Sequence, residues 1–280
     1  MHEYEDIADP DNVAQGDVIE WLPPRASAPW RIFGVVVTAD CDLVWKKHDG
    51  VVSYVPAMPA RDFVWHSWRP TYFAKHQPKL MAEAAKRLNT WRAKQGSMGE
   101  LTASAVRDWL ARAGVDGLLD ELGATDKGQR NGLRPPLEKL LAVETALACE
   151  TPDLPLLRRA HEATNQTSAA NAAILVREVQ NVWSGLPGDV YHLPSTPEGE
   201  EGGLFLLLRH IRQLGVDEIT GRPGAVRAGE AHAKRVARVR APFRYAITQS
   251  LAKVFADIGL PDDHDIRKKD AAARLFESWS

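Results

Sequence analysis

This chain has few of the features that identify whole classes of protein. Among its 280 residues there are two cysteines, Cys41 and Cys149, far apart in the sequence, so a disulfide framework is not expected. No apolar run approaches the roughly 20 residues that span a bilayer. The acidic start, Met1–Asp6, lacks the basic and apolar regions of a secretory signal. We therefore expect a cytoplasmic protein that makes no contact with a membrane.

Neither sign of charge dominates. With 35 Lys and Arg against 37 Asp and Glu, the net charge is −2, which excludes a polycation that coats nucleic acid. No phosphate-binding loop, dinucleotide glycine pattern or Ser/His/Asp order is found, and no His pair has metal-site spacing. We expect no cofactor and no metal. Apolar residues make up 44% of the chain, an ordinary share for a globular protein with a real core.

The chain does contain short apolar runs with β character, separated by turn-forming residues, at both of its ends, and the first three are rich in β-branched residues. These runs predict strands of a small antiparallel barrel. They lie at 17–21, 34–37, 51–55, 189–193, 204–208 and 236–240.

Between these runs the pattern becomes helical, from about residue 72 to residue 183. Apolar residues recur on one helical face over 81–91, Thr102 is a candidate N-cap, and Pro135-Pro136 is expected to open a helix. A further helix is expected over 168–183, and a last one from Pro242.

Together these elements predict an α+β fold. An SH3-like barrel is built from residues 1–70 and 186–280, residues 71–185 form a helical insertion, and a helix ends the chain. We favour one interrupted barrel because two or three strands alone rarely bury enough apolar surface. The alternative of three consecutive small domains remains open.

In outline the β segments resemble the MazF/PemK toxin family, SH3-like barrels that cleave RNA. The segments that carry the resemblance are Gly16-Asp17-Val18, Pro23-Pro24-Arg25-Ala26-Ser27, Val35-Val36-Val37-Thr38, Tyr54-Val55-Pro56 and Leu208-Arg209-His210-Ile211-Arg212-Gln213-Leu214. The resemblance implies metal-independent cleavage in which Arg25 supports general acid or base chemistry. It departs from the family at Ala26, where the family has Gly, and at Met58-Pro59, where the family has a hydroxyl residue that helps to hold the phosphate. We therefore expect a barrel that keeps the fold and has lost the chemistry.

Asp40-Cys41-Asp42 follows an apolar run and is a second candidate catalytic site. If the strand continues, Asp40 and Asp42 share one face and Cys41 the other. Two carboxylates so placed suit acid–base chemistry or a divalent cation. The alternative is a strand end at which both carboxylates bond turn amides and Cys41 packs inward.

Two basic segments are candidate binding surfaces for nucleic acid or for an acidic partner. Residues 61–94 interleave basic and aromatic side chains, a composition that suits phosphate contacts and base stacking. In residues 222–244, two arginines are expected to share a strand face. The alternatives are a barrel-to-bundle core with a solvated face, and an edge strand kept soluble by its charges. The candidate residues are Arg61, Trp65, Trp68, Arg69, Lys75, Arg238 and Arg240.

The function expected from these patterns is that of a non-catalytic binding or adaptor component. A long insertion in a toxin-like barrel is best explained by contact with something else, and lost site residues fit an interaction role. The heavy use of Ala and Arg suggests a bacterial source. We expect the protein to work in a multi-gene system of antiphage defence or toxin–antitoxin type. We expect its partner to be a protein of the same operon, and RNA or DNA is the second class of partner considered. The alternatives are a metal-independent endoribonuclease of MazF/PemK type and a nucleic-acid-binding regulator.

Overall fold

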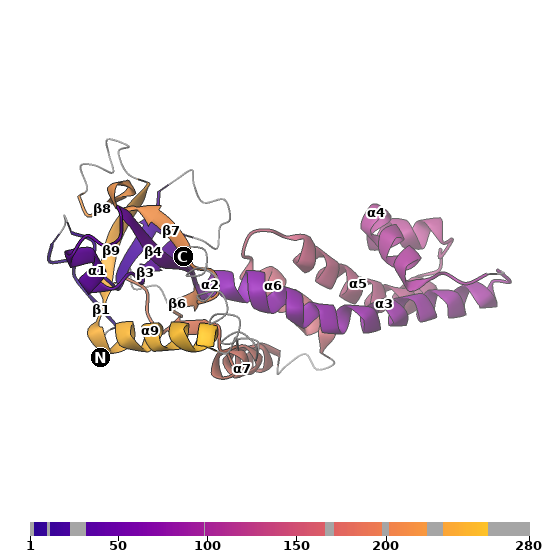
Figure 1. Ribbon diagram of the computed structural model, residues 1–280. Helices are drawn as coiled ribbons and strands as arrows, with labels where there is room; N and C mark the ends of the chain where they lie inside the picture. The colour runs from indigo at the N-terminus through magenta and orange to yellow at the C-terminus, as the bar shows by residue number, and fades with distance from the viewer. Residues whose placement is uncertain are drawn as a thin grey trace, which may run out of the picture.

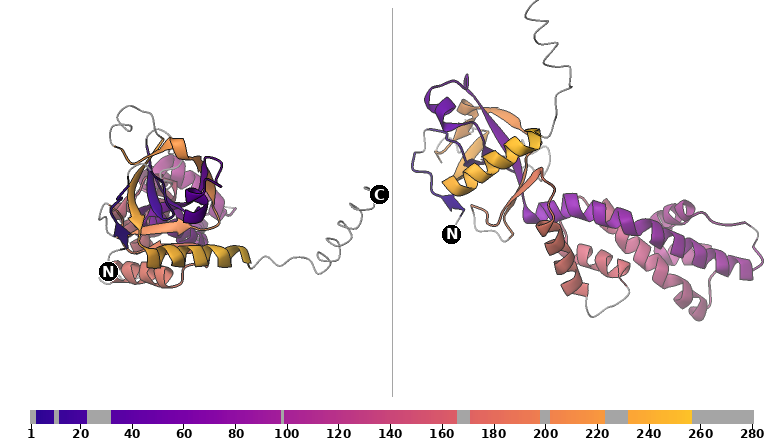
Figure 2. Two further views of the ribbon diagram at one scale, coloured as in Figure 1. Left: turned by 60° about the vertical axis from the view of Figure 1, so that its left-hand side comes forward. Right: turned by 60° about the horizontal axis from the view of Figure 1, so that its bottom comes forward.

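A curled β-sheet forms one end of the molecule, and a long helical arm projects from it (Figures 1 and 2). The computed structural model describes residues 3–9, 12–22, 32–97, 99–165, 171–197, 202–222 and 232–256. The fold is α+β, as the sequence predicts, and its sheet takes strands from both ends of the chain.

The sheet is antiparallel except where β8 pairs with β9. Its strands run in the order β1-β9-β2-β3-β4-β6-β5, with β7 also paired to β4 and β8 to β9. Their bounds are β1 Tyr4–Glu5, β2 Asp17–Trp21, β3 Phe33–Val36, β4 Val51–Pro59, β5 Val190–Leu193, β6 Leu204–Leu207, β7 Arg212–Gly215, β8 Ile219–Thr220 and β9 Ala233–Val239.

Two irregularities curl this sheet into a half-barrel. The register between β2 and β9 shifts between Val18 and Ile19, and such a bulge increases the local twist. Strand β4 pairs with β7 through its first half and with β6 through its last three residues. Strand β9 lies between β1 and β2, so the alternative of a solvated edge strand is wrong for this segment.

Each face of the sheet packs a separate apolar cluster. Val35, Val55 and Val239 lie on the face covered by the C-terminal helix α9, Ala241–Ala256, which buries Ile247 against them. Ile19, Val36 and Tyr54 belong to the cluster on the other face. This alternation is the period-2 pattern by which the strands are recognised in the sequence.

The arm is built from long helices around a core of its own. Helix α5 packs against α3, α4 and α6, and the buried residues that these helices share are mostly Leu, Val and Ala. The helices of this part of the chain are α2 Ala60–Phe63, the π-helical turn η1 Val64–Trp68, α3 Arg69–Lys94, α4 Ala103–Glu121, α5 Lys127–Ala148, α6 Leu154–Thr164 and α7 Asn171–Ser184.

The predicted helix starts are in part confirmed. Thr102 caps α4, where its hydroxyl accepts a hydrogen bond from the amide of Ala105. Pro135-Pro136 do not open a helix but lie inside α5. That helix begins at Lys127 because the carboxylate of Asp126 accepts a hydrogen bond from the Gln129 amide, and apolar packing carries it past the prolines.

A small apolar cluster joins the arm to the sheet. Phe63 of α2 stacks on Phe205 of β6 with ring centroids 4.0 Å apart, and Trp183 of α7 packs beside them. Among the described residues, the chain forms no helix with the length and apolar character needed to cross a membrane.

Candidate functional site at the junction of sheet and arm

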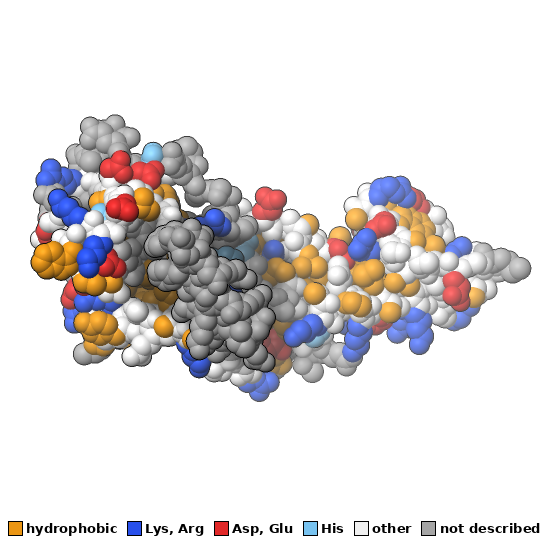
Figure 3. Space-filling model, in the orientation of Figure 1, with side chains coloured by type: hydrophobic (Ala, Val, Ile, Leu, Met, Phe, Trp, Pro, Cys, Tyr) orange, Lys and Arg blue, Asp and Glu red, His pale blue; other side chains and the backbone are white. Residues whose placement is uncertain are grey.

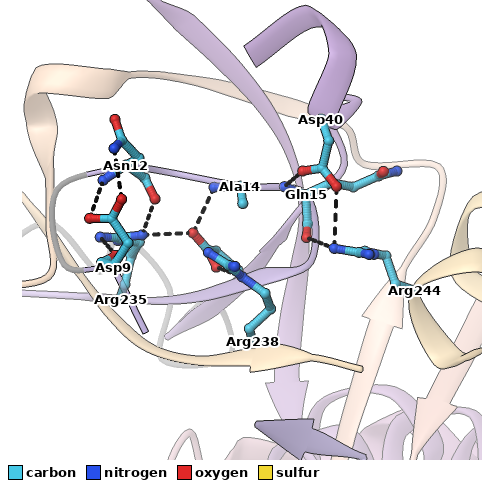
Figure 4. Close-up of polar contacts among 9 residues, drawn as sticks. Asp9, Asn12, Ala14, Gln15, Asp40, Arg235, Arg238 and Arg244 are labelled. Atoms are coloured by element: carbon cyan, nitrogen blue, oxygen red, sulfur yellow. Dashed lines mark hydrogen bonds and ion pairs between the residues drawn. The ribbon is translucent and has the colours of Figure 1, made fainter. Parts of the chain in front are cut away.

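Two of the predicted site residues, Asp40 and Arg238, lie in two neighbouring sets of polar contacts, one around Asp40 and one around Asp17 (Figure 4). Asp17 begins β2, and its side chain is fully buried. Its carboxylate accepts hydrogen bonds from the amide of Ala14 at 2.8 Å, from Arg238 Nε at 2.7 Å and from Arg235 Nη1 at 3.0 Å. Arg235 also donates to the carbonyl of Asp9 at 2.9 Å. We call Asp17, Arg235 and Arg238 the Asp17 cluster.

Gly16 gives this cluster its geometry. It adopts a φ of +86°, which a glycine reaches without steric cost. Its amide donates to Val36 of β3 and its carbonyl accepts from Val239 of β9, both at 2.8 Å. The turn thereby delivers the Asp17 side chain between strands that come from opposite ends of the chain.

Asp40 and Asp42 do not share a strand face, so that expectation is corrected. They lie in the one-turn helix α1, Asp40–Val44, where residues two apart point to different sides. Asp40 accepts from the amide of Gln15 at 2.8 Å and lies 3.3 Å from Arg244 Nη1 (Figure 4). Cys41 does not pack inward but is exposed.

The predicted arginines at the end of β9 are used within the fold. The hydrogen bond to Asp17 is the largest effect on Arg238 and raises its pKa. Arg240 follows the strand, is exposed and donates from Nε to the carbonyl of Tyr4 at 2.9 Å. Arg25 lies outside the described residues. What the structure describes of this end of the sheet is thus a set of ion pairs that ties β2, β9, α1 and α9 together.

The aromatic and basic residues predicted for binding lie where the sheet meets the arm. Trp65 is 2% exposed, donates from its indole nitrogen to the carbonyl of Cys149, and lies 4.1 Å from the buried guanidinium of Arg69. Arg69 donates to the same carbonyl at 2.7 Å. Burial lowers the Arg69 pKa. These two residues close the end of α5, and Trp65 presents no open ring face to a base.

Two hollows open between this junction and α7. The first, the Leu154 groove, encloses about 680 Å³ and is lined among others by Arg61, Val64, Trp65, Leu154, Val176 and Trp183. The second, the Tyr72 cleft, encloses about 630 Å³ and is lined among others by Ser67, Trp68, Tyr72, Lys75, His76 and Glu178. The predicted binding segment is therefore divided between two hollows.

The Leu154 groove is apolar with one free cation. Leu154 is 68% exposed and Val176 55% exposed, high values for large apolar side chains. Arg61 is exposed, and its side chain makes no hydrogen bond or ion pair within the described part of the chain. The indole nitrogen of Trp183 is buried and has no partner there either. The carboxylate of Asp153 is occupied in capping α6 through the amide of Leu156 at 2.9 Å.

The Tyr72 cleft is lined by four titratable side chains, Tyr72, Lys75, His76 and Glu178. The Tyr72 ring lies between Trp68 at 4.8 Å and His76 at 4.5 Å. Burial raises the pKa of Tyr72 and lowers that of His76. His161 is fully buried, and its Nε2 lies 2.7 Å from the carboxylate of Glu178.

Sequence reasoning missed Leu154, Val176 and Glu178. Leu154 and Val176 look in the sequence like any other apolar residues of amphipathic helices, and only their exposure in the fold distinguishes them. In the parts of the chain that the structure describes, no three His, Cys, Asp or Glu side chains gather as a metal site would require.

Comparisons with family models, with curated proteins and with solved structures gave no match to this chain.

Proposed function

We propose that this protein is a non-catalytic binding protein, an adaptor within a bacterial multi-gene system of antiphage defence or toxin–antitoxin type. In this proposal the Leu154 groove docks a segment of a partner protein of the same operon. The sheet and the arm core hold the groove open between α2, α6 and α7.

The observation that carries the proposal is the pair of exposed apolar side chains on the rim of the groove. Leu154 and Val176 face water although each has a large apolar surface. Covering such a surface contributes about 25 cal/mol for each Å² removed from water. Exposed apolar patches rimmed by polar residues mark interaction sites.

The polar groups of the groove specify the chemistry of the partner. Arg61 is the groove's uncompensated cation and favours an acidic residue. The buried indole N–H of Trp183 has no hydrogen-bond acceptor among the described residues. A backbone carbonyl of a bound segment can accept its hydrogen bond. The segment that fits carries bulky apolar residues next to Asp or Glu.

The Asp17 cluster supports a role without catalysis. Arg235 and Arg238 both pair with Asp17, so none of the three is a free general base or a free phosphate ligand. Asp40 is paired separately with Arg244. An arrangement that stabilises the sheet is a sufficient reason for these charges.

The proposal is tested by selecting binders from a display library of random dodecapeptides. We expect the wild type to enrich peptides with two or more bulky apolar residues and at least one acid. Arg61→Glu should weaken the binding of the selected peptides by about tenfold or more, because a charge-assisted hydrogen bond is replaced by a repulsion between like charges. Arg177→Glu on α7 makes the same charge change next to Val176 and is the matched control.

Two results would overturn the proposal. One is a selection that gives no acidic, apolar class of peptide, or peptides that bind both Glu variants equally well. The other is cleavage of single-stranded RNA that persists in EDTA and is lost in Arg25→Ala, which would establish the endoribonuclease alternative.

A further inference from the structure

Helix α3 and the turn before it carry aromatic rings on their buried side and cations on their exposed side. The aromatic side chains of residues 64–94 all belong to the arm core or pack against it: Trp65, Trp68, Tyr72, Phe73 and Trp91. The exposed basic side chains of the same segment are Lys75, Lys79, Lys86, Arg87 and Lys94. Folding thus separates the two kinds of residue that the sequence interleaves.

The charge of α3 is one-sided, although that of the whole chain is nearly balanced. The helix contains seven Lys and Arg residues and one acidic residue, Glu83. Four of its exposed cations lie within about 100° of one another around the helix axis. Lys75 is not counted with them, because Glu178 lines the Tyr72 cleft beside it. We call the four the α3 stripe: Lys79, Lys86, Arg87 and Lys94.

The side chains of the α3 stripe are free of partners within the protein. In the part of the chain that the structure describes, none of the four makes an ion pair or a hydrogen bond through its side chain. Figure 3 shows Lys and Arg side chains along the lower edge of the arm, the edge on which α3 lies in Figure 1. These cations are therefore available to a ligand.

The carboxylates around the stripe leave it positive. Glu83 lies on the same face and forms no ion pair with Lys79 or Arg87 among the described residues. Glu100 precedes Leu101, whose amide donates to Asn89 on another side of α3. The acidic residues of the neighbouring helices are engaged elsewhere: Glu144 with Gln77, Asp108 with Arg107, Asp116 with Arg134, Asp120 with Arg130 and Glu121 with Arg112.

The chemistry of the stripe fits a phosphate backbone better than a protein surface. The other exposed residues on this face are small, Ala82, Thr90 and Ala93, so the face has no large apolar side chain for a protein to cover. Protein interfaces gain most of their affinity from such anchors. Phosphates require only positive charges at the right spacing.

The same face favours a duplex over a single strand. Single strands are bound by stacking their bases on exposed aromatic rings, and the rings of this segment lie in the arm core. From Lys79 to Lys94 the stripe is about 22 Å long. That length spans about six or seven phosphates of one strand of a duplex.

We propose that the α3 stripe binds the phosphate backbone of a double-stranded nucleic acid without reading its bases. The stripe lies on the arm and is separate from the Leu154 groove, so this contact does not depend on the proposed partner protein. It gives an adaptor a second surface, one that places its partner on a duplex.

The inference is tested by fluorescence anisotropy of the full chain with labelled duplex DNA and duplex RNA of mixed sequence. We expect at least one duplex to bind with a Kd of about 1–100 μM at low salt. The affinity should fall about tenfold when the salt concentration doubles, because four phosphate contacts release bound counterions.

A pair of double variants locates the contact. Lys86→Glu, Arg87→Glu should weaken duplex binding by about tenfold or more, because two attractions are replaced by repulsions. Lys46→Glu, Lys47→Glu makes the same change in net charge at two adjacent exposed lysines on the sheet, and should weaken it by less than about threefold. All four residues are exposed, so both variants should fold, and circular dichroism checks that they do.

Four outcomes would overturn the inference. Two are the absence of duplex binding at about 100 μM protein and low salt, and equal losses in the two double variants. The others are tighter binding of a single strand than of the duplex of the same sequence, and equally tight binding of polyglutamate, which would assign the stripe to an acidic protein.

Discussion

Asp17 is the residue on which the sheet depends most. It is fully buried and ion-paired to two arginines, and the side chain of Arg235 is itself only 1% exposed. Removing one partner of a buried pair is costly because it leaves the other charge without compensation. The pair itself contributes less than that cost suggests, since both groups lose their hydration on folding.

We predict that Asp17→Asn lowers the free energy of unfolding by about 3–5 kcal/mol, since Arg235 would remain buried without a counter-charge. Urea unfolding measures the loss. Asp42→Asn is the matched control, because among the described residues its carboxylate has only a 3.8 Å contact with Cys41 Sγ, and it should change stability by less than about 0.5 kcal/mol. Equal effects of the two variants would contradict the role assigned to Asp17.

A second prediction concerns Gly16. A Cβ at this position would lie 2.9 Å from Arg244 Cδ and 3.2 Å from the carbonyl oxygen of Val239. Gly50 has a similar φ, +78°, but open space around it. Gly16→Ala should therefore cost about 1–3 kcal/mol more than Gly50→Ala, the excess being the steric part. Thermal unfolding of both variants checks this, and equal losses would show that backbone strain alone matters.

At this scale the sequence predicts part of the site. The Gly16-Asp17 pair stands out as a motif, but its partner Arg235 is 218 positions away along the chain. No local pattern identifies such a contact, and only the pairing of β2 with β9 creates it.

At the scale of elements, local sequence patterns predict helices and strands correctly where burial of apolar side chains decides the structure. The strands β2, β3, β4, β5, β6 and β9 are confirmed because short apolar runs bounded by turn-forming residues are typical of strands. The continued strand considered for Asp40–Asp42 is wrong, because these residues begin the helical turn α1 and so short a segment has no periodicity to read. Its helical turn is secured instead by tertiary contacts of Asp40 with Gln15 and Arg244.

A third prediction concerns the stability of the arm, which should depend on pH because of His76 in the first turns of α3. Burial lowers the pKa of His76 below its ordinary value of 6.5, so the folded state binds this proton less readily than the unfolded state. The stability contribution of neutral His76 is present above the unfolded pKa and is lost as the pH falls through the folded pKa. Unfolding measured between about pH 7.5 and pH 5 should show this loss, and His76→Gln should reduce it. An unchanged slope in the variant would contradict the assignment.

At the scale of the whole molecule, the sheet and the arm have separate cores joined by the Phe63–Phe205 cluster. The division of the sheet between the two ends of the chain follows from the order of strand and helix patterns. The two hollows cannot be predicted from that order. They arise where α2, α6 and α7 meet the sheet, and they depend on the angles between these elements. Figure 3 shows one face of the resulting surface, with apolar side chains in patches among charges of both signs on both parts of the molecule.

The central claim is that the Leu154 groove docks a partner protein. The most direct measurement is co-expression of the chain with the product of each gene beside its own, followed by size-exclusion chromatography. We predict a stable complex with at least one neighbour, lost in a Leu154→Asp, Val176→Asp variant. The complex should persist in Val44→Asp, which makes the same kind of change at an exposed residue of α1 on the sheet. No complex with any neighbour, or a complex that survives the groove variant, would contradict the claim.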